Sequence, residues 1–225
     1  MKKVLNAAII LLWMGPAIGG AAQTKPWTKP FTEWSIKDAN KVLTDSPWAQ
    51  TQVVSDIRAM TFNPSQAGGS HQAQHITYWI RFLSAKPVRQ ALYRTYELSG
   101  KVTQPELEEA RKFVERKYEN SIVVAVLFES SDPQYNAQAF ATFSKAVTSL
   151  LRNNTYLEVK TSKRLFLQEY QPPGSDGLGA KFIFPRLVNG EPFIKPGDKV
   201  VRFVGMNLNM QFKVPDMMYN GALEY

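Results

Sequence analysis

The feature that most constrains the fold of this chain is a nearly continuous apolar segment at residues 121–128, with the sequence SIVVAVLF. Its many β-branched residues are typical of a strand, and it lacks the alternation of polar and apolar residues that a half-exposed strand shows. A strand without a polar side is covered on both faces. We therefore expect residues 121–128 to lie at the centre of a sheet, with other elements packed on each side.

Helices are predicted before and after this strand. Ser35 with Asp38, and Thr103 with Glu106, have the spacing of a helix N-cap, at which side chains satisfy free backbone amides. Apolar residues then recur at helical spacing. The predicted helices begin near Ser35, Pro87, Thr103 and Asp132, and the last of them is expected to run to residues 153–154.

Short strand-like segments make up much of the remaining sequence. Two precede the central strand, at residues 51–62 and 76–82, and five follow the last helix, at residues 156–160, 165–170, 181–184, 199–205 and 208–214. Gly, Pro and Asn supply turns between the later segments at the spacing of an antiparallel module. The pattern predicts one α+β domain over residues 35–225, with a mixed or antiparallel sheet covered by three or four helices. It is helix-rich over residues 35–153 and β-rich over residues 154–225, and the strands that begin at residues 121 and 156 are expected to link these parts.

Residues 1–22 have the form of a secretory signal peptide, because Lys2 and Lys3 precede an apolar run and small residues follow it. An uncleaved anchor is the alternative, but the apolar run at residues 4–14 is shorter than the roughly 20 residues of a membrane span. We therefore expect an exported protein, periplasmic or extracellular, with no transmembrane span after cleavage before Gln23. Residues 23–34, which contain two Pro and two Lys, are expected to form an extended arm.

The chain contains no Cys, so no disulfide or lipoprotein anchor can form. Its formal net charge is +8 at pH 7, of which Lys2 and Lys3 of the leader supply +2, and the remaining basic excess is shared evenly by residues 23–130 and 131–225. Nucleic-acid-binding domains concentrate such charge on one helix or stripe, and no motif of that kind is present, so nucleic acid is not an expected partner. The charge is that of a solvated basic surface, and the interaction that it allows is with an anionic envelope polymer or lipid headgroup.

The motifs for metals, cofactors and nucleophiles are incomplete. His71 and His75 lie where a Gly-rich loop enters a strand, and in a strand this spacing separates residues by about 13 Å, too far for one metal ion. Asp132 follows the central strand without the glycines of a nucleophile elbow, so a helix N-cap explains it. The Gly-rich loop at residues 174–179 lacks the Lys of a phosphate-binding loop, which leaves a strand connection, or a calcium ligand at Asp176, as alternatives. We predict no metal and no cofactor.

Paired carboxylates are a catalytic arrangement that no sequence spacing reveals. The acidic residues that folding could bring together are expected at solvated strand edges, and they are Glu129, Glu158, Glu169 and Glu191.

Large apolar residues gather near both ends of the chain after the leader. Three tryptophans, Trp27, Trp34 and Trp48, lie near the start, and Met206, Met210, Met217 and Met218 lie near the end. Such clusters occur in interfaces and also in core packing. The three tryptophans are our candidate interface residues, with packing as the alternative.

Four segments of the chain resemble a family of exported bacterial proteins to which no activity has been assigned. They are EWSIKDANKVLTDSPWAQ, YWIRFLSAKPVRQAL, EYQPPGSDGLGAKFIFPR and FKVPDMMYNGALEY, and together they cover most of the chain after the leader. The region from Trp34 to Asp45 is also similar to the GWxTD domain, without the pentapeptide for which that domain is named. The resemblance implies export and one shared architecture, and it implies no catalytic residue or ligand.

These observations favour a non-catalytic binding or assembly component of the bacterial cell envelope, whose partner is an envelope protein or an anionic envelope polymer. The sequence shows no nucleophile–base pair, which argues against an enzyme. Two alternatives stay open: a hydrolase of envelope carbohydrate or peptide that uses Asp or Glu, and a carrier of a small apolar ligand. The sequence leaves the oligomeric state open.

Overall fold

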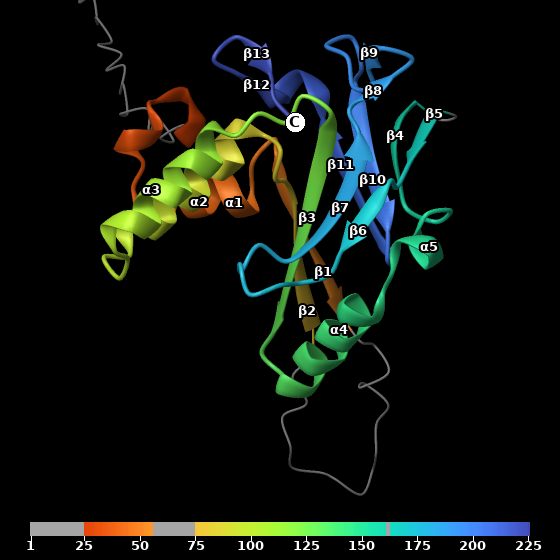
Figure 1. Cartoon of the computed structure of the whole chain (residues 1–225), viewed down its shortest axis with the longest axis horizontal. Coiled ribbons are helices and arrows are strands. Elements are labelled where there is room, and N and C mark those ends of the chain that lie inside the picture. The colour runs from red at the N-terminus through yellow and green to blue at the C-terminus, as the bar shows by residue number, and fades with distance from the viewer. Residues whose placement is uncertain (1–24, 56–74, 161–162) are drawn as a thin grey trace, which may run out of the picture.

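The computed structural model describes residues 25–55, 75–160 and 163–225. The predicted signal peptide, the first two residues of the predicted arm, residues 56–62 of the first predicted strand, and His71 lie outside these ranges. The predicted α+β class is confirmed, because helices are combined with antiparallel sheets and the last third of the chain is rich in strands (Figure 1).

The larger sheet has five strands in the order β1-β2-β3-β7-β6, each antiparallel to its neighbours. Its strands are β1 (Ala49–Ser55), β2 (His75–Phe82), β3 (Ser121–Ser130), β7 (Ala180–Pro185) and β6 (Glu169–Gln171). The central position predicted for residues 121–128 is confirmed, and the side chains from Ile122 to Val126 are buried.

The smaller sheet has four antiparallel strands in the order β11-β10-β4-β5. They are β11 (Leu208–Lys213), β10 (Val200–Gly205), β4 (Tyr156–Lys160) and β5 (Lys163–Phe166). Two short hairpins complete the β structure: β8 (Leu187–Val188) with β9 (Glu191–Pro192), and β12 (Met218–Tyr219) with β13 (Ala222–Leu223). The predicted link through residue 156 is corrected, because β4 belongs to the smaller sheet, and it is β6 and β7 that carry the β-rich part into the larger one.

The helices begin where the sequence predicted. They are α1 (Ile36–Thr44), α2 (Lys86–Leu98), α3 (Gln104–Glu115), α4 (Pro133–Lys145) and α5 (Thr148–Leu151), with 3-10 turns η1 (Pro26–Thr28), η2 (Phe31–Glu33) and η5 (Val214–Met217). Ser35 and Thr103 form capping boxes, and Asp132 caps α4 through the backbone amide of Gln134 at 2.8 Å. The last predicted helix is divided, because residues 146 and 147 adopt extended backbone angles between α4 and α5.

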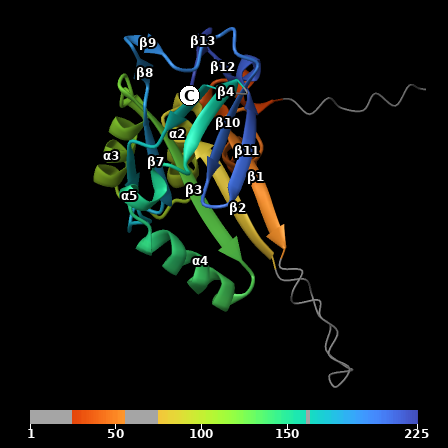
Figure 2. The ribbon, with the colours of Figure 1, turned by 90° about the vertical axis from the view of Figure 1, so that its right-hand side faces the viewer.

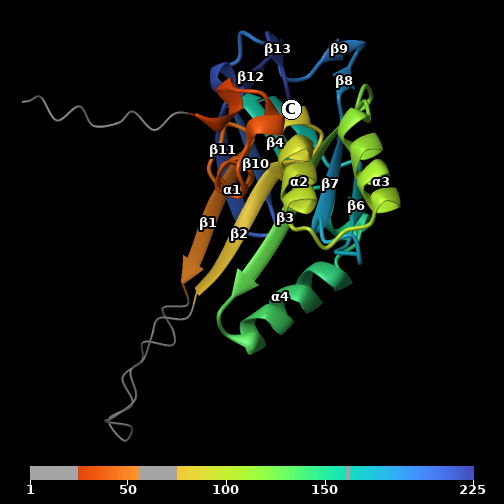
Figure 3. The same ribbon diagram turned by 90° about the vertical axis from the view of Figure 1, so that its left-hand side faces the viewer.

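The elements form layers around the larger sheet. Helices α1, α2 and α3 lie on one side of it, and the smaller sheet lies on the other (Figures 1 and 3). Aromatic side chains fill the space between the sheets, where ring centroids are 4.9 Å apart for Phe82 and Phe212 and 5.2 Å apart for Phe182 and Phe203. Helix α4 packs against the larger sheet through the stacked rings of Phe143 and Phe128.

The carboxyl end of α1 shows how the helices are fixed to this sheet. The last four carbonyl groups of a helix have no partner within it. Here each finds a donor: the carbonyl of Lys41 accepts from the Asp45 amide, that of Val42 from Ser46 Oγ at 2.7 Å, that of Leu43 from Arg81 Nε at 2.7 Å, and that of Thr44 from Thr51 Oγ1 at 2.8 Å. Arg81 and Thr51 come from β2 and β1, so the end of α1 is bonded to the sheet that it covers.

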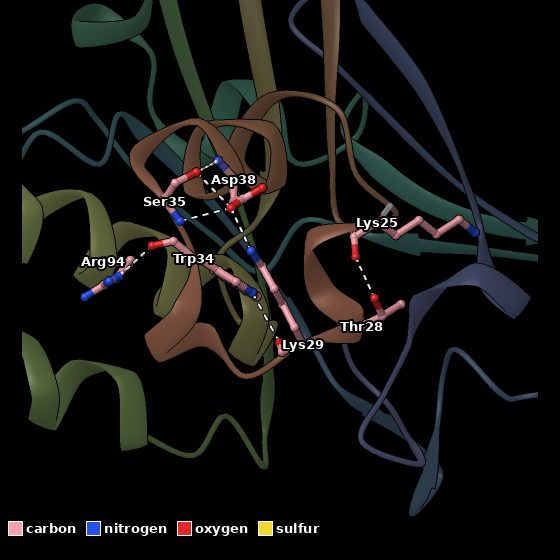
Figure 4. A network of polar contacts seen from close by, with 7 residues as sticks. All are labelled: Lys25, Thr28, Lys29, Trp34, Ser35, Asp38 and Arg94. Atoms are coloured by element: carbon pink, nitrogen blue, oxygen red, sulfur yellow. Dashed lines mark hydrogen bonds and ion pairs between the residues drawn. The ribbon is translucent and has the colours of Figure 1, made fainter. Parts of the chain in front are cut away.

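Residues 25–34 form two packed 3-10 turns instead of the extended arm that the sequence predicted. Trp34 Nε1 donates to the carbonyl of Lys29 at 3.2 Å, and its own carbonyl accepts from Arg94 Nε at 2.8 Å (Figure 4). Lys29 Nζ lies 3.0 Å from the carboxylate of Asp38, which also caps α1. These contacts with α1 and α2 fix the segment to the domain.

Candidate functional site

Two of the three candidate interface residues lie in the core. The side chains of Trp34 and Trp48 are 0% exposed. Trp48 Nε1 donates to the carbonyls of Glu224 at 3.0 Å and Met217 at 3.3 Å, far away in the sequence. A side chain without exposed surface cannot contact a partner, so the packing alternative explains Trp34 and Trp48.

Trp27 keeps part of its surface exposed. Its ring contacts Trp48 edge to face, with centroids 5.7 Å apart, and its other side lines an open groove of about 440 Å³. Lys25, Lys213 and Gln211 also line this groove, and the last two belong to β11. Of the three tryptophans, Trp27 is therefore the one placed to contact a partner, beside the edge of the smaller sheet.

The other sequence candidates have structural partners. His75 is exposed at the start of β2, and no group of acidic residues and histidines that could hold a metal is found among the described residues. Asp176 accepts from the amide of Leu178 at 3.0 Å and lies 2.7 Å from Lys181 Nζ. Gly179 has φ +81°, and a Cβ atom there would lie 2.3 Å from the carbonyl oxygen of Val126. Close backbone approach therefore explains this glycine without a bound phosphate.

The acidic candidates do not meet. Glu129, Glu169 and Glu191 are exposed on three different strands, and Glu191 forms an ion pair with Lys195. Glu158 differs from the expectation of a solvated edge, because its side chain is only 6% exposed. Its carboxylate lies between the guanidinium groups of Arg164 and Arg202, so it is paired with cations and not with a second carboxylate.

These guanidinium groups belong to the solvent face of the smaller sheet, which we call the outer face. Alternate residues of β11, β10, β4 and β5 point away from the core here, and no described helix lies over them (Figure 2). Two rows cross the strands: Gln211, Arg202, Glu158 and Arg164 form one, and Asn209, Val204, Tyr156 and Phe166 form the other.

The first row carries charge. Arg164 Nε lies 3.1 Å from Glu158, and the Arg202 guanidinium donates to the other oxygen of the same carboxylate. Hydrogen bonds from Arg164 and Arg202 hold the pKa of Glu158 below its usual range, although partial burial opposes them. Lys213 follows on the same face of β11. Among the described side chains of this face, three cations therefore accompany one carboxylate, which gives the face a positive excess.

The second row is aromatic. Phe166 is 46% exposed, and its ring meets that of Tyr156 with centroids 5.9 Å apart. The Arg164 guanidinium lies 4.5 Å from the centre of the Tyr156 ring, so it also orients this row. Aromatic rings with an exposed face or edge are surfaces on which apolar parts of a ligand stack.

The sequence contains a partial signal for the outer face. Apolar residues that point inward alternate with the residues of the outer face in β4 and β10, with Leu157 and Phe203 next to Glu158 and Arg202. The alternation identifies which side chains share the solvent side. It does not reveal which strands are neighbours, so it cannot predict that the two arginines contact one carboxylate.

No family model, curated protein or solved structure matches this chain. Among the described residues, no helix has both the length and the apolar character required to cross a membrane.

Proposed function

We propose that this protein is an exported, non-catalytic binding component of the bacterial cell envelope, and that its outer face binds an anionic envelope polymer. The observation that carries the proposal is the row of Arg202, Glu158 and Arg164 beside the exposed ring of Phe166, on a sheet face that no described element covers.

The geometry suits an extended polymer better than a small substrate. Guanidinium groups recognise carboxylates and phosphates through paired hydrogen bonds, and Glu158 fixes the orientation of both arginines in advance. Side chains that are already ordered lose less conformational entropy on binding. The aromatic row offers a stacking surface next to the charges, and the groove at Trp27 lies along the β11 side of the same sheet.

The two alternatives from the sequence have less support. A carboxylate-dependent hydrolase needs two facing acidic groups, and the buried acidic residues of the described chain, Glu158 and Asp198, accept instead from arginines and from the backbone amide of Lys195. For a carrier, the groove of about 370 Å³ lined by Tyr78 and Phe143 has apolar side chains in its wall, but it is open to solvent and does not enclose a ligand.

The proposal is tested by titrating the protein with polygalacturonate, a carboxylated polysaccharide, and with neutral dextran. We expect polygalacturonate alone to bind, with an affinity that falls as salt is added. The double variant Arg164→Gln/Lys213→Gln should bind about tenfold more weakly, since each lost surface ion pair contributes up to about 1 kcal/mol.

The control is the double variant Lys37→Gln/Lys101→Gln, which changes the net charge equally at exposed sites away from the outer face. If both double variants weaken binding equally, net charge and not the outer face is responsible, and the proposal is wrong. A second pair separates the aromatic contribution: Phe166→Ser should weaken binding, whereas Phe140→Ser on α4, where the side chain is 54% exposed, should not.

Export is tested separately. Fractionation of the native host, followed by intact-mass measurement, should find the protein outside the cytoplasm with Gln23 as its first residue. Recovery of the full-length chain from the cytoplasm would contradict the proposal.

A further inference from the structure

A second basic site lies away from the outer face, in a pocket of about 330 Å³ between α2, the segment that follows α3, and the end of the chain. The cations that line it are Lys86, Arg89, Arg116, Lys117 and Arg186, and they exceed the three carboxylates of the lining. The volume is at the lower end of the range of ligand pockets, which suits a ligand of monosaccharide size.

Arg89 is the buried cation of this pocket. It is 4% exposed, and its guanidinium donates to four backbone carbonyls, those of Val114 at 3.2 Å, Arg116 at 3.0 Å, Leu83 at 3.4 Å and Ser84. Among the described residues it forms no ion pair with a carboxylate. Burial lowers its pKa, which nearby Tyr118 and the carboxylates of Glu224 and Glu115 partly oppose. The N–H groups of Arg89 are taken up by backbone carbonyls, so Arg89 contributes positive charge to the pocket and not a free donor, and this charge favours an anion there.

Tyr118 brings a second guanidinium to the same place. The Arg89 and Arg116 guanidinium carbons lie 5.0 and 5.4 Å from the centre of its ring. Arg116 and Lys117 are exposed and form no ion pair among the described residues, so their charges are available to a ligand.

Part of the pocket is already occupied by an anion from the protein itself. Glu224 Oε2 accepts from the backbone amide of Lys86, the first residue of α2, at 2.9 Å. The amino end of a helix attracts negative charge. The Glu224 carboxylate therefore shows that negative charge is stabilised at the amino end of α2. The same carboxylate repels a second anion that enters the pocket.

We propose that this pocket binds a small ligand that carries a phosphate or carboxylate group, through Arg116 and Lys117, with Glu224 as an internal competitor. The site is independent of the polymer-binding face, because it is built from different elements.

The experiment is calorimetric titration with glucose 6-phosphate, glycerol 3-phosphate and glucuronate, with glucose as the neutral control. These probes separate a phosphorylated sugar, a lipid-headgroup-type phosphate and a carboxylated sugar. We expect at least one of the anions to saturate below about 10 mM, and glucose not to bind. Absence of saturation for all three anions overturns the proposal.

Two variants with opposite expected effects distinguish this site from general attraction to a basic protein. Lys117→Gln should weaken binding by about threefold to tenfold, as expected for one partly exposed charge, whereas Lys101→Gln, the matched exposed control, should not. Glu224→Gln can still accept from the Lys86 amide but removes the repelling charge, so it should tighten binding by a similar factor.

Equal effects of the two lysine variants, or weaker binding by Glu224→Gln with unchanged thermal stability, would refute the assignment. Polygalacturonate binding should be unchanged in Lys117→Gln, so the outcomes of the two proposals are separable.

Discussion

The indole of Trp48 provides the sharpest test of how this fold is stabilised. It is fully buried, and its single N–H is directed at the carbonyls of Glu224 and Met217, which fixes the last segment of the chain to the β1 side of the domain. The substitution Trp48→Phe keeps most of the apolar ring and removes the donor. Both carbonyls are then left without the indole donor.

The cost follows from these contacts. The Met217 carbonyl keeps the Glu224 amide as a donor, so the cost comes from the partly buried Glu224 carbonyl. Loss of such a hydrogen bond costs about 1–3 kcal/mol, and the smaller ring adds a cavity term. We expect the free energy of unfolding to fall by about 2–3 kcal/mol, which lowers the melting temperature by about 4–12 °C in a domain of this size.

The measurement is urea denaturation followed by circular dichroism, with Trp79→Phe as the matched control. Trp79 is half-buried in β2, and no hydrogen bond of its indole is found in the described structure, so its replacement should cost less than about 0.5 kcal/mol. Native-state hydrogen exchange should also become faster at residues 217–225 in Trp48→Phe alone. If the two variants lose equal stability, the indole hydrogen bonds do not fix the end of the chain, and the reasoning fails.

Three further predictions concern single positions. Gly179→Ala should cost about 2–4 kcal/mol, because its Cβ would clash with backbone, whereas Gly177→Ala, with φ +67° and open space, should cost about 1–2 kcal/mol; thermal melting of both checks this. Burial raises the pKa of Tyr170 from 10.0 to about 12. The neutral phenol therefore contributes its full share to the free energy of unfolding below pH 10, and this share is lost as the pH rises towards 12. Tyr170→Phe should make the free energy of unfolding less sensitive to pH in that window. Arg81→Leu should cost about 2–4 kcal/mol by urea denaturation, because it removes the donor at the carboxyl end of α1.

The parts of the fold that the sequence predicted depend on contacts between near neighbours. Ser35 and Thr103 cap helices through residues three positions later, so their spacing is sufficient evidence. The central position of β3 could be predicted because this segment has no polar side. The division of α4 from α5 was missed because the apolar stripe continues across residues 146 and 147, although the backbone there is extended.

Features that depend on distant contacts could not be predicted in this way. Trp34 lies in a segment with two prolines and resembles part of an exposed arm, yet a hydrogen bond from Arg94, sixty positions away, holds its backbone against α2. The same limit applies to the candidate site. Alternation places Glu158 on the side of the strand opposite Leu157, but only the pairing of β4 with β5 and β10 places an arginine on each side of it. Of the predicted interface residues, Trp27 alone kept an exposed surface.

The contacts of Glu224 connect the stability of the fold to the proposed pocket. Its carbonyl accepts from Trp48, its amide donates to the Met217 carbonyl at 3.1 Å, and its carboxylate accepts from Lys86. The backbone of this residue is therefore held by the core, and only the side chain takes part in the pocket. Displacement of the carboxylate by the proposed anionic ligand would therefore leave the backbone contacts of Glu224 in place. The binding effect of Glu224→Gln and the stability effect of Trp48→Phe should consequently be separable, since the first changes a charge at the pocket and the second changes the hydrogen bonds that position its backbone.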